Sequence, residues 1–259
     1  MTVKGKIALV TGAGSGLGKA SALKLARKGA DVAVLSRTKE EVDTVCAEIE
    51  ALGQRALPLY ADVSDLADMI SAFDQIKQSF GRLDIVFANA GINGTWAPID
   101  ELDVEDWDQT IAINLRGTFL TFKFAVPLLK QQGGSIIVTS SINGTRTFTT
   151  AGASAYSTTK AGQLALVQMT ALELAQYKIR VNAICPGAIE SNIDENTNRE
   201  NAERAAVPVH FPEGDIPLTG GEPGRAEDVA DLVHFLASDA SRHITGTPVW
   251  IDGGQSLLV

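Results

Sequence analysis

Short apolar runs alternate along this chain with longer amphipathic stretches. The runs are rich in Val, Ile, Leu and Ala and are bounded by Gly, Asp or Ser, a composition that favours β-strands. Apolar residues occupy consecutive positions in most of them, which is typical of strands covered on both faces. The predicted strands are Lys6–Thr11, Asp31–Leu35, Arg55–Tyr60, Leu83–Asn89, Ser135–Ser140, Ile179–Cys185 and Pro248–Asp252.

Helical patterns separate these strands. The stretch Leu17–Gly29 ends at a glycine, which is a frequent helix stop. A longer helix is predicted from the N-cap residue Asp103 toward Gln132, and Pro127 is expected to bend it. Two more helices are predicted at Ser154–Tyr177 and Ala226–Ser238. Since single helices that join parallel strands make right-handed crossovers, the pattern predicts an α/β fold: one doubly wound parallel sheet of about seven strands with helices on both faces.

The pattern contains no linker, internal repeat or low-complexity tract, so residues 1–259 are expected to form a single domain. One segment, residues 192–224 in approximate bounds, has no periodicity and is rich in Asn, Glu, Pro and Gly. A long irregular segment inside a compact domain is usually functional. We predict that this segment is a substrate loop or lid.

Composition and charge exclude several classes of function. Hydrophobic residues make up 45% of the 259 positions, and the formal net charge of −9 argues against nucleic acids and anionic membranes as partners. The sparse cysteines, Cys46 and Cys185, exclude a disulfide scaffold and fit a reducing compartment. Scattered histidines give no metal-ligand spacing, so no metal is expected. No apolar run is long enough for a signal peptide or a membrane span, and we expect a cytoplasmic protein.

A glycine-rich turn connects the first predicted strand to the first helix. Its spacing is Thr-Gly-x-x-x-Gly-x-Gly, because Leu17 and Lys19 stand where the last glycine of a G-x-G-x-x-G fingerprint would fall. Glycines let the backbone approach a diphosphate, whose charge is stabilised by the helix N-terminus. The turn predicts a Rossmann-type dinucleotide site, although methyltransferases also use such turns. The predicted cofactor contacts here are Thr11, Gly12, Gly14, Ser15, Gly16, Leu17 and Gly18.

Tyr156 and Lys160 are four positions apart in a predicted helix and should therefore project from one face. A phenol ordinarily has a pKa of about 10. A neighbouring ammonium and the positive ring of an oxidised nicotinamide would lower that pKa, so the phenol would work as an acid or base near neutral pH.

In combination, these residues resemble the short-chain dehydrogenase/reductase family over nearly the whole chain. The motifs that carry the resemblance occur in family order: the Thr11–Gly18 turn, Ala88-Asn89-Ala90-Gly91, Asn114, Ser140-Ser141, Tyr156-x-x-x-Lys160 and Pro186-Gly187. The resemblance implies an NAD(P)-dependent oxidoreductase that moves hydride between the nicotinamide and a carbonyl or secondary alcohol.

The resemblance also implies a catalytic tetrad of Asn114, Ser141, Tyr156 and Lys160. Tyr156 would be the general acid/base, and Ser141 would hold the substrate oxygen. Lys160 would bind the nicotinamide ribose and depress the Tyr156 pKa, and Asn114 would hold a water of the proton relay. Ser140 is an alternative to Ser141, but alternation along a strand would let only one of the two face the site.

This sequence departs from the family pattern in two places. The spacing from Ser141 to Tyr156 is longer, which places extra residues in Thr145–Gly152 beside the substrate. Ala88 stands where Asn is frequent, and Asn89 with the following glycine is expected to stabilise the loop instead.

The residues after the second strand bear on the choice of cofactor. Ser36 stands where an acid would mark NAD, and Arg37 follows with a guanidinium suited to a 2′-phosphate. We therefore predict a preference for NADP(H), with NAD(H) as the alternative. Further cofactor contacts are implied by the resemblance at Asp62, Val63, Asn89, Ala90, Gly91, Pro186, Gly187, Ile189 and Ser191, besides Tyr156 and Lys160.

The sequence leaves the substrate open among small alcohols and ketones, including sugars, polyols and hydroxysteroids. A 3-oxoacyl-acyl-carrier-protein reductase is the alternative of the same class, although the net charge of −9 disfavours an acidic carrier protein. A remoter alternative is a non-catalytic dinucleotide-binding regulator, but such relatives typically lose the Tyr or the Lys. The resemblance further implies a homotetramer, or a homodimer, built on the two long helices and the apolar C-terminal end.

Overall fold

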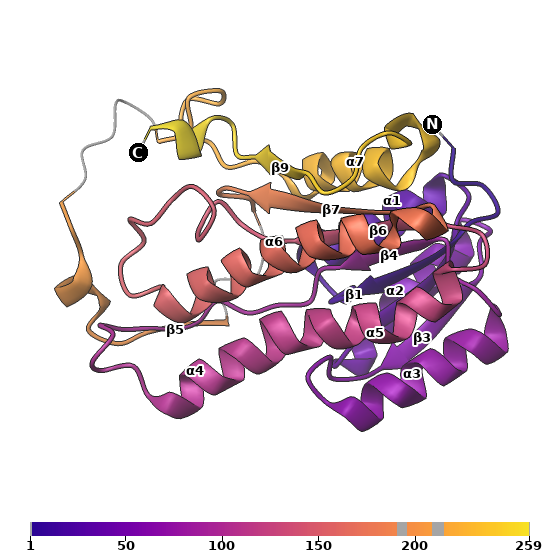
Figure 1. Cartoon of the computed structure of the whole chain (residues 1–259), viewed down its shortest axis with the longest axis horizontal. Helices are drawn as coiled ribbons and strands as arrows, with labels where there is room; N and C mark the ends of the chain where they lie inside the picture. Colours follow the sequence, from indigo (N-terminus) through magenta and orange to yellow (C-terminus); the bar gives the residue numbers. More distant parts are fainter. Residues whose placement is uncertain (1, 191–195, 209–214, 259) are drawn as a thin grey trace.

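The computed structural model describes residues 2–190, 196–208 and 215–258. Its centre is a seven-stranded, wholly parallel sheet in the order β3-β2-β1-β4-β6-β7-β9 (Figure 1). All seven predicted strands are present, and the predicted α/β fold is confirmed. Their bounds are β1 Ile7–Thr11, β2 Asp31–Ser36, β3 Ala56–Tyr60, β4 Ile85–Ala88, β6 Gly134–Thr139, β7 Ile179–Pro186 and β9 Pro248–Ile251.

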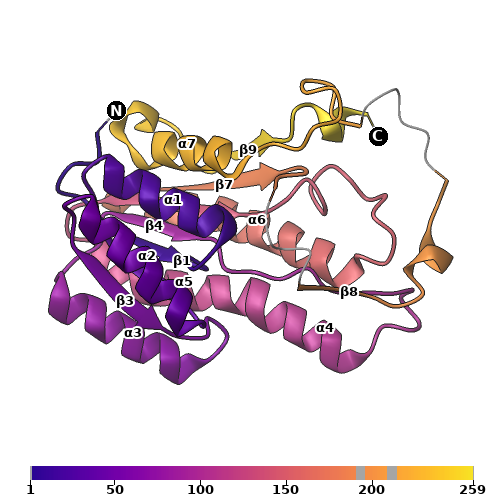
Figure 2. The ribbon, with the colours of Figure 1, turned by 180° about the vertical axis from the view of Figure 1, so that it is seen from behind.

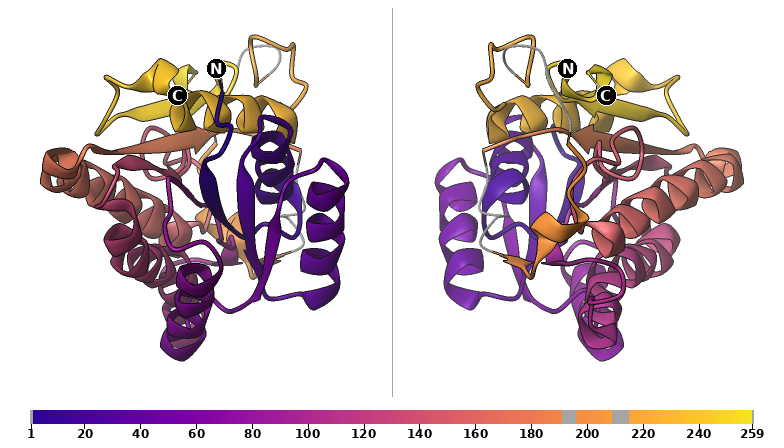
Figure 3. Two further views of the ribbon diagram at one scale, coloured as in Figure 1. Left: turned by 90° about the vertical axis from the view of Figure 1, so that its right-hand side faces the viewer. Right: turned by 90° about the vertical axis from the view of Figure 1, so that its left-hand side faces the viewer.

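Helices cover both faces of the sheet, and each face has its own apolar core. α1 (Gly16–Arg27), α2 (Lys39–Ala51) and α7 (Ala226–Ala237) pack on one face (Figure 2). α3 (Leu66–Ser79), α5 (Gly117–Leu129) and α6 (Ser154–Leu174) pack on the other, and the end-on views of Figure 3 show strands between the two helical layers. Because strands buried on both faces need apolar side chains on both sides, this arrangement explains the unbroken apolar runs of the sequence.

The predicted helix from Asp103 to Gln132 is not uniform. It consists of α4 (Val104–Thr110), a π-helical segment η1 (Ile111–Arg116) and α5, which continues through Pro127 to Leu129. Widened turns of this kind occur mostly at functional sites. Here the widened turn contains Asn114, a residue of the predicted tetrad, whose side chain is fully buried.

A two-stranded parallel sheet joins two loops that are distant in the sequence. β5 (Gly94–Trp96) pairs with β8 (Thr197–Arg199), and the Asn93 Nδ2 donates to Thr197 Oγ1 at 2.7 Å. β8 belongs to the segment 192–224, which was predicted as an irregular lid. The described part of that segment thus contains regular structure, because the edge of β5 supplies pairing partners that no local pattern reveals.

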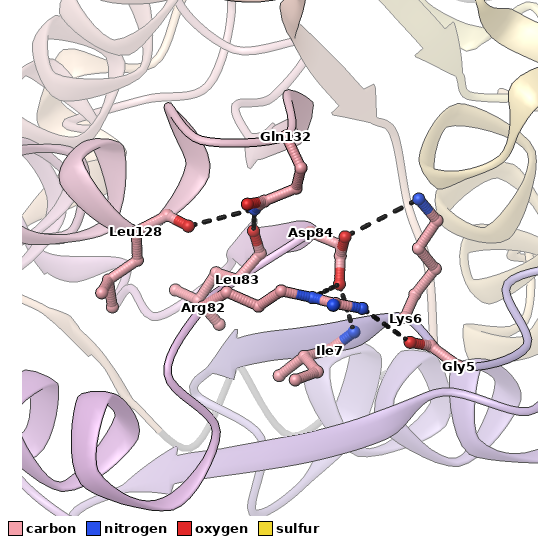
Figure 4. Close-up of polar contacts among 8 residues, drawn as sticks. All are labelled: Gly5, Lys6, Ile7, Arg82, Leu83, Asp84, Leu128 and Gln132. Carbon is pink, nitrogen blue, oxygen red and sulfur yellow. Dashed lines mark hydrogen bonds and ion pairs between the residues drawn. The ribbon is translucent and has the colours of Figure 1, made fainter.

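Asp84 is a buried carboxylate near the start of β4, close to the amino ends of β1 and β4. One carboxylate oxygen accepts from the Ile7 backbone N–H at 2.9 Å and from Arg82 Nε at 3.1 Å, while Lys6 Nζ lies 3.6 Å from the other (Figure 4). A carboxylate that is 4% exposed needs such partners, because an unpaired buried charge costs several kcal/mol. This cluster holds β1 and β4 in register at the end of the sheet remote from their carboxyl ends.

Candidate active site

One cleft, of about 890 Å³, extends over the carboxyl ends of the parallel strands. The glycine-rich turn after β1 forms one end of its wall, together with residues that follow β2 and β3. The loops after β4, β6 and β7 form the remainder, and Tyr156 and Lys160 of α6 lie in the same wall. Ligands of open α/β sheets bind in this position, so the fold itself favours a binding site here.

The glycine-rich turn comes close to the neighbouring backbone. Gly12 has a φ of +62°, and a Cβ added there would lie 2.9 Å from the Ala90 Cα. A Cβ at Gly18 would overlap the Gly12 carbonyl oxygen. These contacts let the turn bring the N-terminus of α1 into the cleft, where Ser15, Gly16 and Leu17 form part of the wall. That arrangement suits the diphosphate of a dinucleotide.

Hydrogen bonds tie the turn after β1 to the loop after β4. The Thr11 hydroxyl accepts from the backbone N–H groups of Asn89 and Ala90 at 3.0 and 3.1 Å. The Asn89 amide group donates to the Thr11 and Gly12 carbonyls at 3.3 Å, and its oxygen accepts from the Thr139 hydroxyl at 3.0 Å. Asn89 therefore connects three loops of the cleft, which agrees with the stabilising role expected in place of an Asn at position 88.

The part of the cleft wall that follows β2 contains both positively and negatively charged side chains. Arg37 has its Nη1 at 3.8 Å from Asp62 Oδ2, and 59% of its side chain is exposed. Ser36, Val63 and the carboxylate-bearing Glu41 line the same region. Glu41 was not among the predicted contacts, although an acid in the first turn of α2 is visible in the sequence. A Cβ at Gly14 would collide with the Glu41 side chain, so this acid lies directly against the turn.

Ser141 and Tyr156 form the centre of the cleft. Both residues line the cleft and are buried, with 6% and 7% of their surfaces exposed, and the Ser141 hydroxyl lies close enough to Tyr156 to favour its phenolate form. Ser140 also lines the cleft, but its hydroxyl donates to the Lys160 carbonyl at 2.8 Å. The hydroxyls of the two serines therefore point to different groups, and Ser141 is the one that lies beside Tyr156.

Lys160 lies behind Tyr156, on the same face of α6. Its Nζ is 5.3 Å from the centre of the Tyr156 ring and donates to the Thr139 carbonyl at 2.8 Å. Burial lowers the pKa of the Lys160 ammonium from 10.5 to about 8. An ammonium with this pKa has a readily available proton near neutral pH.

Asn114 contacts the loop after β4 and not the open cleft. Its side-chain oxygen accepts from the Ile92 N–H at 2.8 Å, and its amide group donates to the Ile92 carbonyl at 2.9 Å. A Cβ at Gly91 would lie 3.1 Å from Asn114 Oδ1 and 3.7 Å from Lys160 Nζ, so the amide and the ammonium both flank Gly91. The backbone carbonyl of Asn114 accepts from Gln163 Nε2 at 2.8 Å.

The pKa of Tyr156 differs in direction from the sequence-based prediction. Burial raises the pKa of this phenol above its ordinary value of 10, and the hydrogen bond with Ser141 opposes part of the rise. The prediction combined Lys160 with a bound nicotinamide cation as causes of a lowered pKa. The protein's own residues do not produce that lowering, since removing the phenolate from water outweighs the neighbouring groups.

The structure brings most of the predicted residues to the cleft wall. Thr11, Gly14, Gly18 and Asn114 are not part of the wall and support it from behind, whereas Pro186, Gly187 and Ile189 after β7 line it. Ser191 lies outside the described residues. Thr147, Thr149 and Thr150 of the loop Thr145–Gly152, which was predicted to lie beside the substrate, also line the wall, whereas sequence reasoning missed Asn93 and Asn143.

Within the described residues, no group of three or more His, Cys, Asp and Glu side chains is arranged to hold a metal ion. None of the described helices combines the length and the apolarity that crossing a bilayer requires. Burial raises the pKa of the Cys185 thiol, which lies close to Ser140 and Thr145, to about 11. This cysteine is therefore a thiol and not a reactive thiolate at neutral pH.

Comparisons with known proteins agree with this geometry. The family model described as enoyl-(acyl carrier protein) reductase matches residues 12–256. The crystal structure of a 3-ketoacyl-ACP reductase from Sinorhizobium meliloti 1021 is 59% identical in sequence, with a TM-score of 0.94 over 98% of this chain and 100% of that one. The chain belongs to the short-chain dehydrogenase/reductase family. It is accordingly a nicotinamide-dependent oxidoreductase that acts on CH–OH and carbonyl groups.

Two other members illustrate how widely this family is represented among the similar proteins. The 3-oxoacyl-(acyl-carrier-protein) reductase of Thermotoga maritima is 37% identical over 255 residues, which are 98% of this chain and 99% of that protein. The crystal structure of carveol dehydrogenase from Mycobacterium avium in complex with NAD is 30% identical, with a TM-score of 0.88 over 98% of this chain and 99% of that one.

Proposed function

We propose that this short-chain dehydrogenase/reductase interconverts a small secondary alcohol and its ketone, with Tyr156 as the general acid/base. The observation that carries the proposal is that Ser141 and Tyr156 lie together in the wall of a cleft that also contains the glycine-rich turn. A phenol and a serine hydroxyl that converge in this way can both bind one substrate oxygen.

The residues of the cleft fit a nicotinamide dinucleotide. Gly12, Ser15, Gly16 and Leu17 would hold the diphosphate, Asp62 and Val63 the adenine, and Lys160 the nicotinamide ribose. When bound, the cofactor supplies or accepts the hydride at the reacting carbon. The adjacent Pro186, Gly187 and Ile189 would contact the carboxamide end, and we extend the same role to Ser191.

The chain's own residues would handle the proton. In reduction, the Tyr156 hydroxyl gives its proton to the substrate oxygen while Ser141 donates a hydrogen bond to the same oxygen. In oxidation, the Tyr156 phenolate takes the alcohol proton. The buried Lys160 ammonium stabilises that phenolate. We propose that a water held at Asn114 exchanges a proton with Lys160 and forms the inner end of a relay to solvent.

A direct assay tests the proposal. The purified protein is mixed with an oxidised or reduced nicotinamide cofactor and a panel of alcohols and ketones, and the absorbance of the reduced nicotinamide is followed. We expect turnover of at least one alcohol–ketone pair. A contrary result would be a protein that binds both cofactors in a separate binding measurement and yet turns over no alcohol or ketone of the panel. That result would contradict the proposed activity and favour the dinucleotide-binding regulator.

We infer a preference for NADP(H) from Arg37. Its exposed guanidinium follows β2 and lines the cleft, where it can pair with a 2′-phosphate. Glu41 also lines this region and would accept hydrogen bonds from an unphosphorylated ribose, so NAD(H) is the second candidate.

Replacing Arg37 tests this preference. We expect Arg37→Ala to lower kcat/KM with NADP⁺ about tenfold to a hundredfold, because a hydrogen bond to a charged group is lost, and to change kcat/KM with NAD⁺ little. The measurement is steady-state kinetics with both cofactors. Arg55→Ala, which removes an exposed arginine paired with Asp31, serves as the control. A wild-type enzyme that is more efficient with NAD⁺ would refute the preference.

Reduction of a 3-oxoacyl group on acyl-carrier protein is the second candidate, because two of the similar proteins carry that name. Two basic residues near the ends of the long helices that could receive an acidic carrier, Lys130 and Arg180, already have partners within the chain. Lys130 Nζ lies 4.3 Å from the Tyr177 ring centre, and Arg180 Nη1 donates to the Ser241 hydroxyl at 2.9 Å. The assay panel therefore includes an acetoacetyl thioester, both free and attached to the carrier protein. A higher kcat/KM for the carrier-bound thioester would favour this candidate.

We also propose a homotetramer, with a homodimer as the smaller alternative. α5 and α6 expose apolar side chains that a monomer leaves in water: Phe119 is 49% exposed, Met169 74% and Leu172 84%. Leu257 near the C-terminal end is 72% exposed. Exposed apolar side chains of this size on two long helices are typical of an interface between copies of a chain.

A charge on this surface should break the assembly. We expect Leu172→Glu to reduce the mass of the protein in light scattering, because a carboxylate cannot be buried in an apolar interface without a partner. Leu52→Glu, at a leucine that is 40% exposed at the end of α2, should leave the mass unchanged. An unchanged mass for Leu172→Glu would place the interface elsewhere.

A further inference from the structure

The cleft continues past Ser141 and Tyr156 into a region whose wall is polar. We call this region the distal wall and define it by its amide and hydroxyl residues: Asn93, Asn143, Thr147, Thr149, Thr150 and Asn196. They come from the loop after β4, the loop between β6 and α6, and the segment before β8. Three separate parts of the chain therefore present uncharged hydrogen-bonding groups to one space, together with the indole of Trp96.

Part of this hydrogen-bonding capacity is not used within the described chain. The Thr147 hydroxyl is buried and has no partner among the described residues. Thr149 is exposed to the cleft, and no hydrogen bond of its hydroxyl is found there. Asn143 accepts from the Thr150 hydroxyl at 2.9 Å, which orients its amide group and leaves the NH₂ free of a described partner. The Thr149 hydroxyl and the Asn143 NH₂ group are therefore available to a ligand with its own hydroxyls, whereas the Thr147 hydroxyl is closed off from the cleft.

The charges in the cleft restrict the ligand further. Among the described wall residues, the cations are Arg37, at the end beyond β2, and Lys160, behind Tyr156. Glu190 and Asp215 also belong to the wall and would repel an anion. A carboxylate or phosphate on the substrate would therefore find no free cation in the distal wall.

We infer that the substrate is an uncharged polyhydroxylated molecule, a polyol or sugar that carries a hydroxyl on the carbon next to the reacting one. This inference rests on the proposed alcohol–ketone activity and names its substrate class. The distal wall would bind the second hydroxyl and so fix which carbon faces Tyr156 and Ser141. A site that binds a hydroxyl in this way discriminates strongly against an analogue that lacks it, because its polar groups are then left unpaired.

The first test compares substrates that differ by one hydroxyl. Wild-type enzyme is assayed with the oxidised cofactor and either vicinal cyclohexanediol or cyclohexanol, with hydroxybutyrate as the anionic arm. We expect kcat/KM for the diol to exceed that for the mono-alcohol by about tenfold or more, the equivalent of one or two hydrogen bonds, and hydroxybutyrate to be the poorest substrate. Equal or better turnover of cyclohexanol or hydroxybutyrate would overturn the inference.

The second test removes one hydroxyl while keeping the shape of the loop. Thr149→Val should lower the ratio of kcat/KM for the diol to kcat/KM for cyclohexanol about fivefold to tenfold. Thr170→Val, the same change on α6 away from the cleft, should leave this ratio unchanged. A loss that is equal for both alcohols would mean a purely structural role and would overturn the assignment.

A binding measurement separates this inference from the proposed chemistry. Calorimetry on the Tyr156→Phe protein, loaded with oxidised cofactor, measures the affinity of the diol and of cyclohexanol without turnover. Tighter binding of the diol would support the distal wall even if the enzyme proved inactive on the whole panel. Turnover of alcohols with equal affinity for both ligands would leave the proposed function intact and refute the substrate class.

Discussion

Replacing Tyr156 by phenylalanine is expected to lower kcat/KM about a hundredfold to ten-thousandfold, the usual contribution of a general acid/base. The substitution removes only the hydroxyl that lies beside Ser141 and keeps the ring that packs beside Lys160. The affinity for the reduced cofactor, measured by its fluorescence, should change far less than kcat/KM. The loss should therefore lie in the chemical step and not in cofactor binding.

A matched control is available in the same chain. Tyr177 lies in a short 3-10 helix, η2 (Ala175–Tyr177), with its ring against Lys130. Tyr177→Phe deletes the same atom outside the cleft wall and should leave kcat/KM unchanged. If Tyr156→Phe retained wild-type turnover, the proton would have to come from another group, and the proposed mechanism would be wrong.

Replacing Lys160 by methionine is expected to abolish most of the activity and at the same time to stabilise the protein. The side chain is 3% exposed, and burial lowers the pKa of its ammonium from 10.5 to about 8. Such a shift means that folding is opposed by the removal of the charge from water. At pH 7, we expect Lys160→Met to raise the free energy of unfolding by about 2 kcal/mol, after allowing for the lost hydrogen bond to Thr139.

The stability difference should depend on pH in a defined direction. Below pH 8 the ammonium is charged in both the folded and the unfolded chain, so the wild type bears the whole cost of burying it. Between pH 8 and 10.5 the folded lysine is neutral while the unfolded one still binds a proton, and wild-type stability rises with pH relative to the variant. The advantage of Lys160→Met should therefore shrink across this interval.

Chemical denaturation of the cofactor-free protein at several pH values measures this effect. Lys77→Met, at an exposed lysine on α3, should change the free energy of unfolding by no more than about 0.5 kcal/mol at any pH. A Lys160→Met protein that was less stable than the wild type at pH 7 would show that the ammonium contributes to folding through its contacts, contrary to our expectation. The activity loss should reflect weaker stabilisation of the Tyr156 phenolate.

The sequence by itself determined the sheet and its layers. Strands such as Ile7–Thr11 and Ile85–Ala88 are apolar at consecutive positions and have helices between them, so local composition carried enough information to predict each one. The glycine turn and the Tyr156–Lys160 spacing are local as well, and both lie in the cleft as the sequence predicts, with Gly12 and Gly16 in its wall.

The features of the site that depend on residues distant in the sequence were decided only by the tertiary structure. β5 pairs with β8, which lies about a hundred residues later in the chain. No local pattern in the sequence predicts such a contact between strand edges. The rise in the pKa of Tyr156 follows from the burial of its phenol, and the Ser140 hydroxyl donates to the Lys160 carbonyl because α6 packs beside the end of β6. The polar distal wall has the same origin, because Asn93, Thr149 and Asn196 meet only when three loops fold over one end of the sheet. Local patterns specify elements, whereas burial and side-chain contacts across the sheet specify the chemistry of the site.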